Sequence, residues 1–232
     1  YIEVSRYVRN YLSYSGSLTY QDITTPAVNG GSVTATSPSI CPGGSVKINN
    51  NSSASAGFNG TGFNYQWQIS YNNSSWSNIS GATLSYYNTP LLYSTRYYRR
   101  RATDCKGTKG YSNTVTVTVV SQPSIALSSS APNGDICSGG TTVLSAAVSG
   151  GAGSLNYYWQ YENPAGSGNY TTIFTGAGSA TSPFTTTQNA SPSITRNYRL
   201  LVSNSLGCYA SAIQLVTVIP DPVLSFSSTD VS

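Results

Sequence analysis

Short segments in which apolar and polar residues alternate follow one another along the chain, and turns rich in Gly, Asn and Ser separate them. Alternation with a period of two is typical of β-strands that bury one face. In the first half of the chain the pattern predicts seven strands, near residues 32–37, 45–50, 63–71, 75–80, 82–88, 95–103 and 111–120. Charged residues make up 8% of the chain, too few for the solvated faces of several helices. We therefore expect an all-β protein.

Three motifs occur twice along the chain, roughly 97 residues apart, and this spacing indicates tandem repeats. Ile-Cys-Pro-Gly-Gly at 40–44 recurs as Ile-Cys-Ser-Gly-Gly at 136–140, Gln-Trp-Gln at 66–68 as Tyr-Trp-Gln at 158–160, and Thr-Arg-Tyr-Tyr-Arg at 95–99 as Thr-Arg-Asn-Tyr-Arg at 195–199. Pro26, Pro123 and Pro220 fall at the same spacing and indicate the joints between repeats. The expected layout is the last strands of a preceding repeat at 1–25, full repeats at 26–122 and 123–219, and the start of a following repeat at 220–232.

Seven strands per repeat, with a Trp on the third and a Tyr on the sixth, are typical of an immunoglobulin-like β-sandwich. We expect Trp67 and Tyr98 in the core of the first repeat, and Trp159 and Tyr198 in the core of the second. The alternative for the Trp residues is an exposed platform for a sugar. Because they hold matched positions on the third strand, core packing is the favoured interpretation, and tandem sandwiches of this kind form a rod.

The sequence resembles the tandem Ig-like repeats of giant Bacteroidota surface adhesins. The resemblance lies in four segments: Ile40 to Gly44, Tyr65-Gln66-Trp67-Gln68, Trp76 to Thr83, and Tyr97 to Arg100. The SprB-like gliding-motility adhesins, which the type IX secretion system exports, belong to that group. The resemblance implies a non-enzymatic segment of an extracellular cell-surface filament, with reach and display for attachment or gliding as its function. The second repeat departs from the pattern, because Tyr170-Thr171-Thr172-Ile173 replaces the segment around Trp76.

The four cysteines of an exported protein without His are expected to form disulfides. Cys41 opens the second strand and Cys105 follows the sixth, so these two lie at opposite poles of one sandwich, roughly 20 Å apart. A disulfide requires Cα atoms within about 7 Å. Along a head-to-tail rod, the pole that carries Cys41 faces the opposite pole of the next repeat, which carries Cys208. We therefore favour an inter-repeat bond between Cys41 and Cys208, with Cys105 and Cys137 reaching toward repeats outside this segment. Pairing within each repeat, Cys41 with Cys105 and Cys137 with Cys208, stays open as the alternative.

The sequence lacks the residues that most catalytic mechanisms require. The chain has no His, which excludes a Ser/His/Asp triad or a Cys/His pair, and its seven acidic residues stand apart from one another. No Asp-x-Asp spacing or EF-hand loop is present, so we expect no catalytic residues, no metal site and no cofactor. No apolar run approaches the ~20 residues of a membrane span.

Charge is concentrated in the first repeat. Residues 26–122 hold seven Lys and Arg against one Asp, a net +6, whereas residues 123–219 are neutral. A patch of Arg99, Arg101, Lys106 and Lys109 could bind an acidic polysaccharide or another polyanion, and exposed Tyr residues could bind a glycan. The favoured interpretation of the charged patch is a solvated sheet face. The expected principal partners of the chain are neighbouring repeats. Arg100 aligns with Leu200 and points inward, so it either extends its stem toward solvent or finds a hydrogen-bond partner at the sheet margin.

Overall fold

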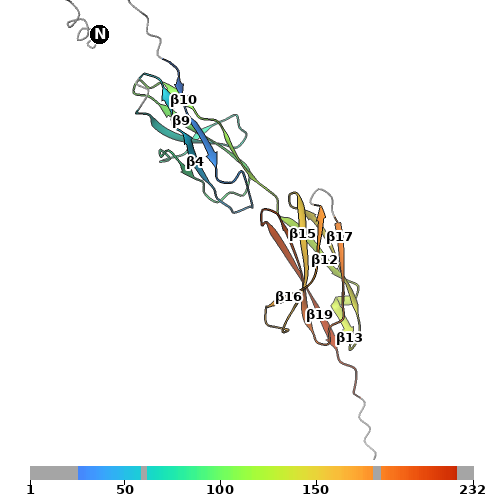
Figure 1. The fold of residues 1–232 in the computed structure, drawn as a ribbon. Coiled ribbons are helices and arrows are strands. Elements are labelled where there is room, and N and C mark those ends of the chain that lie inside the picture. Colours follow the sequence, from blue (N-terminus) through green and yellow to red (C-terminus); the bar gives the residue numbers. More distant parts are fainter. Residues whose placement is uncertain (1–25, 59–61, 180–183, 224–232) are drawn as a thin grey trace, which may run out of the picture.

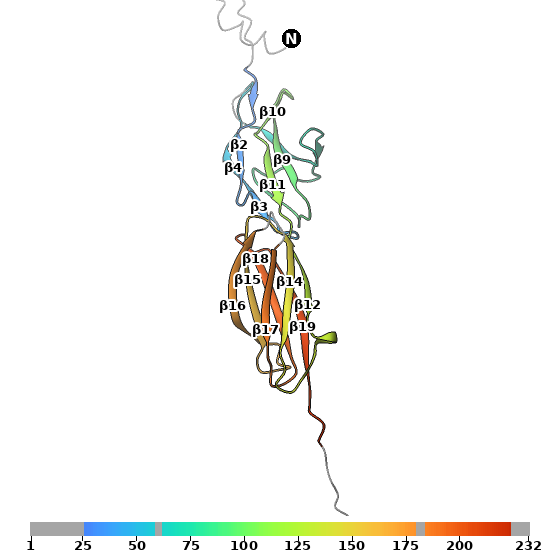
Figure 2. The same cartoon turned by 90° about the vertical axis from the view of Figure 1, so that its right-hand side faces the viewer.

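The structure is a computed structural model that describes residues 26–58, 62–179 and 184–223. It is an all-β protein in which two immunoglobulin-like β-sandwiches lie end to end, as Figures 1 and 2 show. The expected preceding repeat at 1–25, and all but the first four residues of the expected following repeat at 220–232, lie outside the described residues.

The first sandwich packs a three-stranded sheet, in the order β2-β4-β8, against a larger sheet in the order β3-β11-β9-β6-β7, with β10 beside β9. A short pair, β1-β5, closes the pole farthest from the second sandwich. The strands are β1 (Val28–Asn29), β2 (Ser32–Ala35), β3 (Ser39–Ile40), β4 (Lys47–Ser52), β5 (Ser55–Ala56), β6 (Asn64–Ser70), β7 (Ser77–Asn78), β8 (Tyr87–Asn88), β9 (Arg96–Thr103), β10 (Lys109–Tyr111) and β11 (Val115–Val119).

The second sandwich repeats this plan with longer strands, in the sheets β12-β14-β17 and β13-β19-β18-β15-β16. Its elements are β12 (Pro123–Ser129), the 3-10 turn η1 (Pro132–Gly134), β13 (Asp135–Cys137), β14 (Thr142–Gly150), β15 (Ser154–Glu162), β16 (Tyr170–Ser179), β17 (Phe184–Ala190), β18 (Arg196–Asn204) and β19 (Tyr209–Ile219).

The strands of the first sandwich are more broken than their alternation predicts. The segment expected as one strand at 32–37 ends at Ala35, and after Pro38 the chain crosses to the other sheet, where β3 runs parallel to β11. The strands expected at 75–80 and 82–88 pair over only two residues each, as β7 and β8. Proline lacks the N–H that a sheet ladder requires, which accounts for the switch at Pro38.

The aromatic residues expected in the two cores are buried. Trp67, Tyr98 and Trp159 are 0% exposed, and Tyr198 is 6% exposed. Each indole N–H has a hydrogen-bond partner: Trp67 Nε1 donates over 2.9 Å to the Leu84 carbonyl, in the segment before β8, and Trp159 Nε1 donates over 3.1 Å to Thr186 Oγ1 on the opposite sheet. The two Trp residues therefore pack between the sheets, and neither forms an exposed platform for a sugar.

Arg100 is also fully buried, between the two sheets of the first sandwich. Its guanidinium donates to Asn50 Oδ1 at 2.7 Å and to three backbone carbonyls, those of Gly30, Ser52 and Ser85, at 2.9 to 3.2 Å. The Tyr65 ring lies over it, 4.1 Å from centroid to Cζ. Of the two expectations for this residue, the hydrogen-bonded one is correct: the side chain does not extend to solvent but ties the two sheets together.

Candidate functional site: the disulfide-linked joint and a cationic sheet face

The joint between the sandwiches is a three-residue connection, Val120 to Gln122, between β11 and β12. The Val120 N–H donates to the Ile40 carbonyl over 3.0 Å, which holds the connection to the first sandwich. Ser121 Oγ donates to the Gly151 carbonyl over 2.9 Å, which holds it to the second. The connection is short and hydrogen-bonded on both sides.

A disulfide between Cys41 and Cys208 crosses the joint, with Cα atoms 5.4 Å apart. Cys41 follows β3 at the pole of the first sandwich that meets the second, and Cys208 lies in the β18–β19 turn that faces it. The Leu206 carbonyl oxygen lies 3.9 Å from Cys41 Sγ, a further contact across the joint. The inter-repeat bond favoured by strand counting is confirmed, and pairing within each repeat is wrong, because the structure has used one cysteine of each such pair.

Backbone hydrogen bonds fix the two turns that carry this disulfide. After Cys41 the chain reverses at Gly43, whose φ of +79° lies in the left-handed region, and the Gly44 N–H donates back to the Cys41 carbonyl over 3.0 Å. In the other turn, Asn204 Oδ1 accepts the Leu206 and Cys208 N–H groups, both at 3.0 Å. Both sulfur atoms are therefore presented by ordered turns.

The remaining cysteines occupy unequal positions. Cys137 matches Cys41 in the repeated motif and ends the short strand β13, which runs parallel to β19 as β3 runs parallel to β11, and it is exposed at the far pole of the second sandwich. Cys105 is exposed in the β9–β10 turn. The hydrogen bonds of Gly107 and Gly207 align that turn with the β18–β19 turn, and in this alignment the equivalent of Cys208 is Thr108, not Cys105.

The outer face of the larger sheet in the first sandwich carries a row of cations. The register pairs Lys109 with Thr103 and Tyr111 with Arg101, so the side chains of Arg99, Arg101, Lys109 and Tyr111 share one side. Trp76, just before β7, reaches the same side, since its ring lies 4.2 Å from Arg99 Cζ. We call these five residues the cationic face.

Lys106, the fourth member of the expected patch, does not belong to the cationic face. It lies in the β9–β10 turn at the pole, where its Nζ stands 4.5 Å from the centroid of the Phe58 ring. The turn places Lys106 away from the outward side of β9, because strand alternation ends at Thr103. The expected patch of four therefore contains three cations on one face and one at the pole.

The acidic residues found buried in the sandwiches serve loops. Asp104 Oδ1 accepts the N–H groups of Lys106 and Thr108, and Asp104 Oδ2 accepts that of Phe58 from the long loop after β5. Burial raises the pKa of Asp104, but the combined hydrogen bonds from Thr108, Phe58 and Lys106 outweigh it and hold the pKa below its ordinary value. This capping role was missed from sequence, although the Asp-x-x-Gly pattern signals such a turn.

Glu162 has the same role in the second sandwich. Its carboxylate accepts the Gly168 N–H over 2.7 Å and an amide hydrogen of Asn197 over 3.0 Å. The Gly168 hydrogen bond is the main reason why the pKa of Glu162 lies below its ordinary value. Glu162 and Asp104 thus act as loop caps in separate sandwiches, and nothing in their surroundings pairs them for acid–base chemistry.

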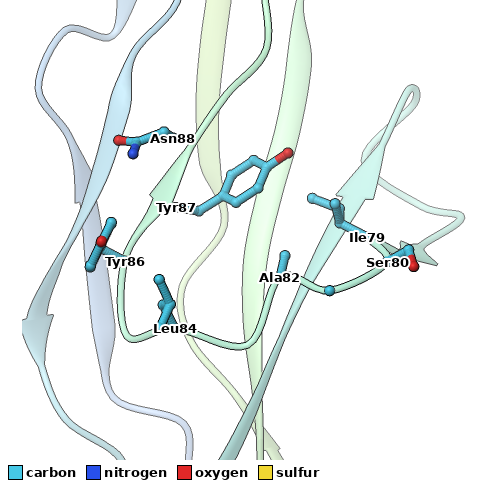
Figure 3. A pocket seen from close by; sticks show the side chains of 8 residues that line it. Ile79, Ser80, Ala82, Leu84, Tyr86, Tyr87 and Asn88 are labelled. Atoms are coloured by element: carbon cyan, nitrogen blue, oxygen red, sulfur yellow. The ribbon is translucent and has the colours of Figure 1, made fainter.

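An open pocket of about 330 Å³ lies on the first sandwich, between the loop at 79–82 and the segment 84–88. Figure 3 shows the Tyr87 ring pointing across this opening toward Ile79, with Tyr86 on the other side of the strand. Its lining has neither a carboxylate nor a cation. Within the described ranges, no group of three His, Cys, Asp or Glu could hold a metal ion. The described residues also include no helix that is long and apolar enough to cross a membrane.

Residues 29–121, which hold the first sandwich, match a family model described as a domain of unknown function, DUF8696. No curated protein sequence matches the chain. Similar solved structures include a 1.5-MDa bacterial ice-binding adhesin, with 14% identity over 85% of this chain and 66% of that chain and a TM-score of 0.37.

An ice-binding adhesin of an Antarctic bacterium is also similar, with 12% identity over 85% of this chain and 50% of that one and a TM-score of 0.33. The fibronectin(III)-like modules of Clostridium thermocellum CbhA have 12% identity over 84% of this chain and 98% of that one, with a TM-score of 0.33. The chain spans about two thirds and one half of the two adhesin chains that it resembles. Its structural neighbours thus include two bacterial adhesins.

Proposed function

We propose that the chain is a non-enzymatic rod segment of a long bacterial cell-surface adhesin and that it provides reach and display. The observation that carries this proposal is the second connection across the joint. A disulfide between residues 167 positions apart in sequence, together with the three-residue connection, holds the sandwiches at two points. Two attachment points restrict bending of one sandwich relative to the other in the plane that contains both points. This restriction suits a segment that keeps a binding end far from the cell surface.

The proposal includes neighbouring repeats as partners. The repeats would occupy 26–122 and 123–219, with parts of others at 1–25 and 220–232. Cys137 stands at the far pole in the position that Cys41 has at the joint, which supports a bond from Cys137 to the turn of a following repeat. Disulfides persist in oxidising compartments, so this chemistry supports an extracellular location.

The finer assignment is a SprB-like adhesin of Bacteroidota, exported by type IX secretion and used in surface attachment or gliding. It rests on the motifs quoted from the sequence, from Ile40-Cys41-Pro42-Gly43-Gly44 to Tyr97-Tyr98-Arg99-Arg100. A second candidate function, binding of a glycan or polyanion, is favoured by the cationic face and by exposed Tyr residues such as Tyr71, Tyr93 and Tyr209. Binding on a sheet face is compatible with a rod.

Small-angle scattering of the whole chain tests the rod. We expect the wild type to give an extended particle with a narrow range of end-to-end distances. The double variant Cys41→Ser/Cys208→Ser should give a broader range, because only the connection at 120–122 then joins the sandwiches. Cys137→Ser removes a thiol without touching the joint, and it should scatter like the wild type. Identical curves for the double variant and the wild type would overturn the role of the disulfide, and a compact wild-type particle would overturn the rod.

A further inference from the structure

The cationic face holds Arg99 in one fixed orientation. The rings of Trp76 and Tyr111 each lie 4.2 Å from Arg99 Cζ, and its Nε donates to Gln68 Oε1 over 2.8 Å. Gln68 is held in turn, since its Nε2 donates to Asn78 Oδ1 over 2.9 Å. Aromatic contact and the Nε hydrogen bond leave the two Nη groups to bind a ligand. Two parallel N–H donors match the two oxygens of a carboxylate or sulfate.

Further cations stand beside this donor pair without a counter-charge. Arg101 lies two residues along β9, so its Cα is about 7 Å from that of Arg99 on the same side of the sheet. Lys109 is exposed on the neighbouring strand β10. Asp104 is the sole acid between residues 26 and 122, and its oxygens are taken by backbone N–H groups. The attraction of this face for anions is therefore not cancelled from within the sandwich.

Comparison of Arg99 with its equivalent in the second sandwich, Arg199, shows which features are common to both sandwiches and which occur only on the cationic face. Arg199 there donates from Nε to Gln160 Oε1 over 2.8 Å, and the Tyr170 ring lies 3.8 Å from its Cζ. This Gln–Arg–aromatic unit is present in both sandwiches and is a feature of the fold. Leu201, however, stands where the first sandwich has Arg101. Tyr209, the β19 partner of Ser203, stands where the first sandwich has Lys109. The added cations are confined to the first sandwich.

We propose that the cationic face is a binding site for an acidic polysaccharide, in which a carboxylate or sulfate group binds the Nη pair of Arg99 and neighbouring acidic groups bind Arg101 and Lys109. This deepens the second candidate function and does not depend on the rod. The positive charge of the face favours a polyanion as the ligand. The stacking of Arg99 on the two aromatic rings favours an acidic polysaccharide over a nucleic acid. Single-stranded nucleic acid is bound largely by stacking bases on exposed aromatic faces, whereas Arg99 already covers one face of each ring here.

Calorimetric titration of the whole chain with an alginate oligosaccharide, a polymer of uronic acids, tests the site at about 0.15 M salt. We expect saturable binding that Arg101→Gln/Lys109→Gln weakens by about tenfold or more, since two charge-assisted contacts are lost. Arg99→Lys keeps the charge but loses the planar donor pair and the stacked position, and it should weaken binding at least severalfold. The melting temperature of each variant confirms that it is folded.

Two matched controls are available within the chain. Arg199→Lys makes the same change in the second sandwich, and Lys47→Ala removes a cation that lies over Tyr86 on the opposite sheet. Both should bind alginate as the wild type does. If Lys47→Ala weakens binding as much as Arg101→Gln/Lys109→Gln does, net charge alone attracts the polymer and the site is refuted.

Three further outcomes would refute the proposal. No saturable binding of alginate is the first, and binding of a neutral dextran as tight as that of alginate is the second. The dextran result would keep a glycan-binding function while removing its assignment to Arg99. The third is tighter binding of an oligothymidylate with the same dependence on Arg101 and Lys109, which would identify the ligand as nucleic acid.

Discussion

Arg100 on β9 and Leu200 on β18 occupy the same position in the two sandwiches. Each is fully buried, and each pairs with the core Trp on the neighbouring strand: Arg100 with Trp67, and Leu200 with Trp159. A cation and an aliphatic side chain thus fill equivalent places. The first sandwich accommodates the cation with one side-chain and three backbone acceptors and the Tyr65 ring. Burial lowers the pKa of Arg100, and no carboxylate compensates.

Replacing Arg100 with the residue of the second sandwich tests this arrangement. Arg100→Leu should lower the free energy of unfolding of the first sandwich by roughly 2 to 4 kcal/mol, because it leaves buried carbonyl acceptors without donors. Chemical denaturation followed by circular dichroism measures the change. Leu200→Met, a substitution of similar volume in the second sandwich, should cost less than about 1.5 kcal/mol. A stable Arg100→Leu variant would contradict the structural role of the guanidinium.

Each core Trp should support mainly its own sandwich. Trp67→Ala should destabilise the first sandwich by roughly 3 to 5 kcal/mol through the cavity that it leaves, and Trp159→Ala should do the same to the second. Hydrogen exchange, resolved by peptide, separates the two effects. Trp76→Ala, on the cationic face, should change stability by less than about 1 kcal/mol and serves as the control. Equal loss of protection in both sandwiches would contradict independent cores.

Asp104 makes the first sandwich sensitive to acid. Its pKa is lowered on folding, so the stability that it contributes is present above its unfolded pKa of about 3.9 and is lost as the pH falls through the folded value. In Asp104→Asn the amide keeps the Oδ1 contacts but cannot accept the Phe58 N–H at its other end. The difference in unfolding free energy between wild type and variant should therefore shrink as the pH falls below about 4. Asp135→Asn, at an exposed site in β13, is the charge-matched control.

The disulfide can be checked by covalent chemistry. Peptide mapping under non-reducing conditions should recover the Cys41 peptide linked to the Cys208 peptide. The two sulfur atoms come from different sandwiches, so reduction should separate these peptides without altering either core. Recovery of Cys41 linked to Cys105 would contradict the joint as described.

The cysteine pairing could be predicted from sequence because it depends on strand order and on the head-to-tail arrangement of the repeats. Cys41 lies in the turn before the second long strand of the sandwich, β4, and Cys105 lies in the turn after β9, and these positions lie at opposite poles in a sandwich of this topology. The relation between Cys105 and Cys208 was harder to see, because both follow the sixth strand. The structure aligns their turns through Gly107 and Gly207 and so shifts the two cysteines by three positions. Alignment of the sequence on Gly107 and Gly207 would have indicated this shift.

The cationic face was only partly predictable. Strand alternation sends Arg99 and Arg101 outward and Arg100 inward, and both directions can be read from the sequence. The side chains that hold Arg99 cannot, because Trp76 lies just before β7 and Tyr111 lies on β10, and the position of both elements depends on the folded sheet. Lys106 was assigned to the patch by closeness in sequence, although a turn separates it from the strand.

The disulfide also decides which parts of the chain carry tension. When the two ends are pulled apart, the load runs along residues 26–41, crosses the sulfur bond and leaves along residues 208–219. The span between the cysteines has a sequence separation of 167 and would measure roughly 570 Å if fully extended. The bond holds the ends of this span 5.4 Å apart at Cα, so unfolding within the span releases no length to the pulled chain. Under overload the segment lengthens only through its short flanks, and a tether built this way keeps its reach even when a core has failed.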